Sequence, residues 1–393
     1  MFFLKKYNIK SRNIPLMYAI GLFSGVLFFL PILALYFEQD LFSIKNVAII
    51  FAVEAIAVAI FEIPTGALSD IFGRKKVLII DFVITFIALI FLLIGGSIVM
   101  FIGYAIINGF AMALGSGNHQ AFLYDTLKEE GKDKYYKKVI GTLYSLWPLG
   151  ASIGSIIGGY IAKVSLEATV AYTFIPMAIA FILVLFLKEP KYQKPSDTSI
   201  LGHIKAASKV IIKSKQLLIL VIGWLLLMSL GESLHQLKPL FFKYKEIPIE
   251  YFGYFSALVF GLSAISFYIA HSVSEKFGNK KTLIVSIIIS AALGIIATLT
   301  HKYLAAGLLA STSLLFGIRN TIIDYLINKS IPSSYRATIN SMNSFVSQIG
   351  IAVAIPLVGY LADLYSINTA YMIGIGLMFV VPILFMFIKE ENI

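Results

Sequence analysis

The sequence contains no cysteine, which excludes disulfides and thiolate chemistry. Charge is also scarce: 13% of the 393 residues are charged, whereas a soluble domain usually carries about 25%. An enzyme would need histidines and carboxylates clustered in one place. The five histidines are instead scattered, at positions 119, 203, 235, 271 and 301. These absences predict neither an enzyme nor a bound cofactor or metal.

Hydrophobic residues are abundant, at 59% of the chain, and include 31 Phe and 21 Tyr. So few charges cannot solvate the outside of a protein of this size, and most of its surface must therefore contact lipid. The net charge is +11, but the basic residues lie in short gaps between apolar runs. Topology and anionic lipid account for such a distribution, and no nucleic-acid partner is predicted.

Twelve apolar windows are long enough to cross a bilayer, which requires about 20 residues each. They do not alternate as the strands of a barrel would, so we expect an all-α integral membrane protein with 12 transmembrane helices. The windows are 14–37, 46–68, 76–96, 99–126, 139–163, 168–187, 216–240, 250–273, 281–299, 302–328, 337–362 and 367–388.

The orientation follows from the lysines and arginines, which concentrate in cytoplasmic segments. They are frequent in the N-terminal tail and in every second gap, and sparse in the other gaps. Both termini are therefore predicted to be cytoplasmic, in a multi-pass protein of the plasma membrane.

An internal repeat divides the chain. Residues 69–76, SDIFGRKK, match residues 274–281, SEKFGNKK, and residues 159–162, GYIA, match residues 359–362, GYLA. We expect two pseudo-symmetric six-helix bundles, at 1–187 and 216–393, joined by a cytoplasmic linker at 188–215 that contains a basic amphipathic helix. Parallel halves of this kind hold substrate between them near the membrane midplane.

The gap between windows two and three resembles the loop signature of the major facilitator superfamily, through Gly66, Asp70, Gly73 and Arg74. The family usually has a basic residue where this chain has Ile71. The resemblance implies the major facilitator fold, with Asp70 and Arg74 latching the halves in the outward-facing state. Physically, Gly66 permits close helix approach and Gly73 permits a tight turn. A turn and topology signal without a gating role is the alternative.

Window five carries Gly150, Gly154 and Gly158 at every fourth position, with Gly159 adjoining. Such a stripe allows close backbone contact, which we expect with a helix of the other half. It resembles the family's antiporter signature, although Ser155 stands where that signature has proline. The resemblance favours the 12-span drug:proton antiporter group, and ordinary small-residue packing is the alternative.

Ionisable residues within spans are functional candidates, because they are costly unless paired or hydrated. Glu54 and Glu232 are the main candidates to carry a proton or attract a cation. Glu62 and Asp81 are instead expected to pair with the cations at 74–76, and Arg319 with Asp324 could equally form a structural pair. His119 and Gln120 in window four, and Arg319 in window ten, are also candidates to face the substrate cavity from opposite halves. The full predicted set for substrate and proton coupling is Glu54, Glu232, His235, Asp125, Arg319 and Asp324.

The resulting hypothesis is a secondary active transporter that exports lipophilic or cationic drug-like compounds by alternating access. The proton gradient supplies its energy. Its expected partners are a small-molecule substrate, protons and membrane lipid, and the protein is expected to be a monomer. The alternative is a proton-coupled symporter that imports a sugar or small metabolite.

Overall fold

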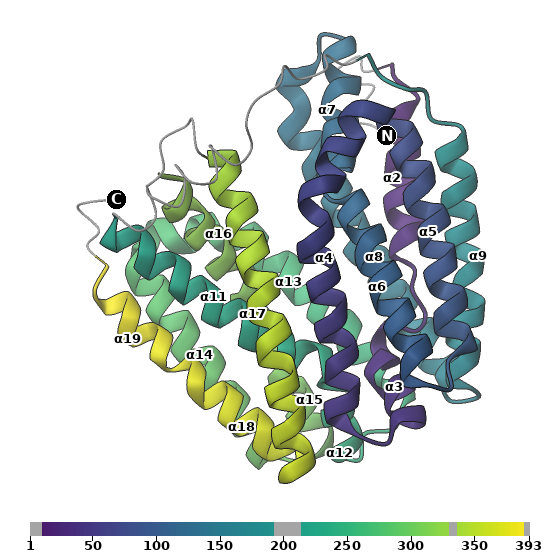
Figure 1. Cartoon of the computed structure of the whole chain (residues 1–393). Coiled ribbons are helices and arrows are strands. Elements are labelled where there is room, and N and C mark those ends of the chain that lie inside the picture. Colours follow the sequence, from purple (N-terminus) through teal and green to yellow (C-terminus); the bar gives the residue numbers. More distant parts are fainter. Residues whose placement is uncertain (1–9, 192–213, 330–335, 389–393) are drawn as a thin grey trace. The chain divides into compact units, whose positions relative to one another are not determined.

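The computed structural model describes residues 10–191, 214–329 and 336–388, without the side chains of residues 63, 66–71, 137, 328 and 336–341. The described part is all-helical, with no β-strand, and contains 12 helical segments long and apolar enough to cross a membrane (Figure 1). This confirms the predicted fold class. Glycine or proline lies at the breaks that divide spans one and four into more than one helix.

The first six spans are built from eight α-helices and one 3-10 turn. Span one comprises α2 (Asn13–Gly25), the 3-10 turn η1 (Leu30–Ile32) and α3 (Leu33–Leu41). Span two is α4 (Ile44–Phe72), and span three is α5 (Arg74–Ile94). Span four comprises α6 (Ile98–Gly115) and α7 (Asn118–Glu129), and a short turn, η2 (Asp133–Tyr135), follows it. Span five is α8 (Tyr136–Ala162), and span six is α9 (Leu166–Leu185).

The last six spans follow the same order. Span seven is α11 (Lys215–Gln236), followed by the short α12 (Lys238–Tyr244). Span eight is α13 (Glu250–Phe277), and span nine is α14 (Asn279–Leu299). Span ten comprises α15 (Lys302–Ser311) and α16 (Ser313–Lys329). Span eleven is α17 (Arg336–Leu364), and span twelve comprises α18 (Ile367–Met378) and α19 (Val380–Met386).

The chain forms two compact units. Unit 1 comprises Met1–Asp40, Ile56–Ser196 and Ile249–Ala257, and unit 2 comprises Leu41–Ala55, Asp197–Pro248 and Leu258–Ile393. The units differ from the two sequence halves in that each contains the first turns of one helix from the other half. Most of the predicted linker at 188–215 lies outside the described residues, so its amphipathic helix stays a prediction.

Glycines at matching positions of the repeat explain this exchange. A Cβ atom at Gly159 of α8 would lie 2.8 Å from the carbonyl oxygen of Glu250, at the start of α13. A Cβ atom at Gly359 of α17 would lie 2.6 Å from the side chain of Ala48, near the start of α4. Because only glycine permits such an approach, α13 begins against α8 in unit 1, and α4 begins against α17 in unit 2.

Charged groups one turn beyond these glycines hold the same contacts. In unit 1, Lys163 Nζ lies 3.2 Å from Glu250 Oε1. In unit 2, the carboxylate of Asp363 accepts hydrogen bonds from the backbone N–H groups of Ile44, at 2.8 Å, and Lys45, at 3.0 Å. A carboxylate at a helix N-terminus satisfies backbone donors that have no partner within the helix. Asp363 thus ties the start of α4 to the end of α17.

Lys245, which lies between spans seven and eight, has a structural role. It is buried, and its Nζ donates to the carbonyl oxygens of Thr298, at 2.7 Å, and Thr300, at 2.8 Å. These carbonyls lie at the C-terminal end of α14, where a cation is favourable. Burial lowers the pKa of the Lys245 ammonium from its usual value.

We expect Lys245→Met to destabilise unit 2 by about 1–3 kcal/mol, because two carbonyl groups lose a charged donor in a buried place. The thermal unfolding midpoint of the purified protein in detergent measures this. Lys243→Met changes an exposed lysine of α12, the short helix that ends just before Lys245, and serves as the control. Equal midpoints for the two variants would show that the cap contributes nothing.

Candidate functional site

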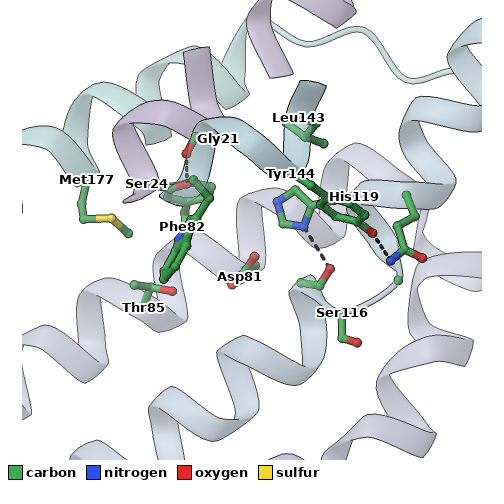
Figure 2. Close-up of a pocket in the computed structure, with 14 residues that line it drawn as sticks. Gly21, Ser24, Asp81, Phe82, Thr85, Ser116, His119, Leu143, Tyr144 and Met177 are labelled. Atoms are coloured by element: carbon green, nitrogen blue, oxygen red, sulfur yellow. Dashed lines mark hydrogen bonds between the residues drawn. The ribbon is translucent and has the colours of Figure 1, made fainter. Parts of the chain in front are cut away.

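Unit 1 contains a cavity of about 370 Å³ between spans one, three, four, five and six (Figure 2). These helices pack side by side within the unit, with α2 against α8 and α9, and α5 against α6, α7 and α9. The residues that line the cavity are Gly21, Ser24, Asp81, Phe82, Thr85, Gly115, Ser116, Gly117, His119, Gln120, Leu143, Tyr144, Trp147 and Met177.

An interruption of span four forms one wall of this cavity. Helix α6 ends at Gly115 and α7 begins at Asn118, with Gly117 at a φ of 74°, where side chains are strained. The apolar window at 99–126 predicted a continuous span, so this helix break was not predicted from the sequence. Non-helical backbone at membrane depth is tolerated where it is buried in protein or lines a cavity. Broken helices of this kind are common at transporter binding sites.

Asp81 of α5 lies in this cavity, and its predicted pairing with the cations at 74–76 is wrong. Its carboxylate approaches the break so closely that a Cβ atom at Gly115 would lie 3.1 Å from Asp81 Oδ2. Figure 2 shows the Asp81 side chain between Thr85, one turn along α5, and His119. Arg74, two turns earlier on α5, instead contacts Asp125. The glycine at position 115 therefore makes room for a carboxylate beside the break.

His119 lies in the first turn of α7, on the other side of the break. Its Nδ1 is 2.9 Å from the carbonyl oxygen of Gly115 (Figure 2). A carbonyl oxygen only accepts, so Nδ1–H is the donor, and Nε2 of the neutral ring is left as an acceptor. The next residue, Gln120, donates from Nε2 to the hydroxyl of Tyr144 on α8. Both residues line this cavity of unit 1, and their predicted place at a cavity between the halves stays a prediction.

The lining has the chemistry of a site for an organic cation. Asp81 is its one carboxylate, and the lining contains no lysine or arginine. The rings of Phe82, Tyr144 and Trp147 supply aromatic surface, which attracts cations through the negative faces of the rings. The cavity volume lies within the usual range of small-molecule pockets, about 300–1,000 Å³.

The residues that the sequence analysis selected for coupling lie elsewhere. Glu54 is half-buried on α4, in unit 2. Glu232 is half-buried on α11, and its Oε1 accepts a hydrogen bond from Gln236 Nε2 at 2.9 Å. His235 lies one turn after Glu232. Burial lowers the pKa of Lys238, just beyond span seven, to about 8, and the charge of Glu232 opposes this shift. Coupling through these residues stays a prediction.

The other three predicted coupling residues lie in two places. Asp125 of α7 pairs with Arg74, whose Nε donates to Asp125 Oδ2 at 3.2 Å. Arg319 and Asp324 both lie on α16. Two side chains that are five residues apart on a helix point in directions about 140° apart around its axis. Arg319 and Asp324 therefore leave α16 on different faces.

The loop between spans two and three is part of a network within unit 1. The carboxylate of Glu189, just after span six, accepts from the backbone N–H groups of Arg74, at 2.6 Å, and Lys75, at 3.0 Å. It thereby caps α5, and Gly73, with a φ of 101°, makes the turn into that helix. The side chains at positions 66–71 lie outside the described residues, so the latch through Gly66 and Asp70 stays a prediction.

Sequence reasoning missed Glu189, although a signal was present. The pair Lys188-Glu189 after span six recurs as Lys389-Glu390 after span twelve. A charged pair repeated at the ends of both halves was therefore a signal for a structural role of Glu189. Glu390 itself lies outside the described residues.

The glycine stripe of span five has a different partner from the one predicted. A Cβ atom at Gly150 would collide with the carbonyl oxygen of Leu22, and one at Gly158 with that of Phe28. A Cβ atom at Gly154 would lie 2.8 Å from the backbone nitrogen of Leu27. The stripe thus packs on span one of its own unit and not on a helix of the other half. Only Gly159 faces a helix of the other half, α13.

Comparisons with known proteins agree with this architecture. The chain matches the family model described as Major Facilitator Superfamily over residues 16–353 and again over 247–392. It is 22% identical over 376 residues to the uncharacterized MFS-type transporter YxaM of Bacillus subtilis strain 168, covering 93% of this chain and 92% of that protein. It is 24% identical over 371 residues to the multidrug efflux protein YfmO of the same organism, covering 90% and 86%.

A solved structure shows the same fold. The nucleoside transporter NupG superposes with a TM-score of 0.78 at 17% sequence identity, covering 97% of this chain and all 100% of that one. Such low identity is evidence for the fold alone. Together with the family match and the 12 spans, it leads to one conclusion: the chain belongs to the Major Facilitator Superfamily and is an integral membrane transporter of small molecules, not an enzyme.

Proposed function

We propose that this transporter exports lipophilic cations in exchange for protons. The observation that carries the proposal is the cavity of unit 1, in which one carboxylate faces aromatic and apolar side chains without a lysine or arginine in the lining. A carboxylate in such surroundings is stable when it binds a proton or a cation. A site that binds either a proton or a cationic substrate, but not both at once, exchanges one for the other across the membrane.

Two further observations support export. The glycine stripe of α8 packs tightly on span one, and its spacing resembles the antiporter signature of the family. The similarity to a multidrug efflux protein extends over most of both chains, although at 24% identity it does not define the substrate. In this proposal the protein acts as a monomer in the plasma membrane, with both termini in the cytoplasm and the proton gradient as its energy source.

Uptake of a polar metabolite with protons is the alternative. It draws on the polar side chains of the cavity, Ser24, Ser116 and Gln120, which could hydrogen-bond a neutral polyhydroxylated substrate. The same groups are compatible with export of an amine, so direction has to be measured.

Everted membrane vesicles test the direction of transport. In vesicles that contain the transporter, an imposed proton gradient, acidic inside, should drive accumulation of ethidium. A protonophore should abolish this accumulation. Vesicles without the protein give the background. Absence of accumulation for ethidium and a panel of lipophilic cations, together with proton-driven release of a sugar or nucleoside, would favour the symporter.

A further inference from the structure

We propose that Asp81 and His119 form the exchange site, in which Asp81 binds the cationic group of the substrate and His119 takes part in holding the competing proton. This inference rests on the proposed export function and deepens it, because it names the residues and the class of ligand. Neither residue was predicted from the sequence to couple transport.

The first step is the position of the carboxylate. Asp81 and His119 reach the same point from opposite sides of the break in span four. A Cβ atom at Gly115 would lie 3.1 Å from Asp81 Oδ2 and 3.3 Å from His119 Cε1. The two side chains are thus neighbours within one cavity, although 38 positions separate them in the sequence. A proton bound at either residue changes the electrostatic field at the other.

The second step is the charge of the surroundings. Among the helices that line the cavity, α2 and α9 contribute no titratable side chain, α8 contributes Tyr144, and α7 contributes His119. No lysine or arginine of the lining offsets an ionised Asp81. An uncompensated charge at membrane depth costs several kcal/mol, so the carboxylate requires either a proton or a bound cation.

The third step is the state of the imidazole. The bond from Nδ1–H to the Gly115 carbonyl holds the ring in one tautomer, with Nε2 free to accept a proton in the neutral form. The protonated ring carries a positive charge beside Asp81 and replaces the substrate cation electrostatically. When the cation enters, the site releases one proton, so one positive charge leaves for each that arrives.

The ligand class follows from the lining. A cationic nitrogen beside Asp81 would place the apolar part of the molecule against Phe82, Trp147 and Met177, with Tyr144 at the edge. We therefore expect a monovalent aromatic or alkyl ammonium compound. A dianion, or a neutral sugar without a basic nitrogen, would not replace the proton at Asp81.

Binding of ethidium to the purified protein in detergent tests the site. Ethidium is permanently charged, so any change of its affinity with pH reports on protonation of the protein and not of the ligand. We expect wild-type affinity to fall as the pH is lowered and protons to be released on binding. Asp81→Asn should lower affinity by about tenfold or more, equivalent to at least about 1.4 kcal/mol, and abolish both the pH dependence and the proton release.

Two other variants complete the test. His119→Gln should keep binding at high pH but change the pH at which affinity falls, which a purely structural histidine would not do. Asp133→Asn makes the same chemical change at an exposed position of η2 in unit 1 and should behave as wild type. If Asp81→Asn does not fold, Gly115→Ala, which crowds the carboxylate, should also weaken binding.

The outcomes separate the two proposals. If wild type binds ethidium and releases protons, but Asp81→Asn and Gly115→Ala do the same, the exchange site lies elsewhere, the proposed function survives and this inference is wrong. If wild type neither binds nor exports any cation of the panel, the export function fails and this inference fails with it.

Discussion

Replacing Gly158 with alanine is expected to abolish transport and to lower stability more than the same change at Gly154 or Gly141. An alanine Cβ atom there would collide with the carbonyl oxygen of Phe28. Backbone cannot rotate away as a flexible side chain can, so α8 and the connection after α2 would have to separate. Overpacking of a tight contact typically lowers the free energy of unfolding by about 1–3 kcal/mol. We expect a collision with the backbone to fall at the upper end of this range.

The glycines of α8 provide a graded series of contacts on one helix. At Gly154 the nearest atom to an added Cβ is the Leu27 nitrogen, at 2.8 Å, and at Gly141 nothing lies within 4 Å. Gly154→Ala should therefore cost less than Gly158→Ala. Gly141→Ala should be neutral or slightly stabilising, because alanine favours a helix by about 1 kcal/mol over glycine.

Thermal unfolding in detergent and ethidium accumulation in vesicles measure the series. The order expected for loss of stability is Gly158, then Gly154, then Gly141. Equal losses of stability at all three positions would mean that any glycine substitution destabilises α8. The close contact with span one would then not determine the effect.

This stripe shows what periodicity can predict. Glycines at every fourth position predicted correctly that one face of span five makes close contacts, since residues four apart lie on one helix face. The partner was predicted wrongly, because the pattern on one helix carries no information about which helix covers it. Gly21 and Gly25 of span one, which face α8, were the available signal on the partner.

The candidate site was predicted only in part. The 12 spans and the all-helical fold followed from long apolar runs, which bilayer thickness dictates. Asp81 was predicted to pair with the cations at 74–76, of which Arg74 is one, because they lie near it in the sequence. Seven residues along a helix keep two side chains on one face but separate them by about 10 Å, too far for an ion pair. The break in span four depends on a backbone conformation, and glycine permits that conformation without requiring it.

The second large effect concerns Arg74 and Asp125, which join spans three and four in unit 1. Arg74 Nε lies 3.2 Å from Asp125 Oδ2, and the side chains are only 13% and 14% exposed. Removing one partner of a buried ion pair is strongly destabilising because the other charge is left behind, at a cost of about 3 kcal/mol. We therefore expect Arg74→Gln to lower the thermal unfolding midpoint sharply.

Restoring charge balance should recover part of this loss. The double variant Arg74→Gln with Asp125→Asn leaves no isolated charge in the pair, so it should be more stable than Arg74→Gln alone, with a coupling of about 0.5–3 kcal/mol. Glu189 caps the backbone of Arg74 and not its side chain, so the cap persists in every variant. Lys76→Gln, at an exposed neighbouring position, is the control. Additive effects of the two single substitutions would show that the pair does not stabilise unit 1, and its contribution would then have to be sought in the transport cycle.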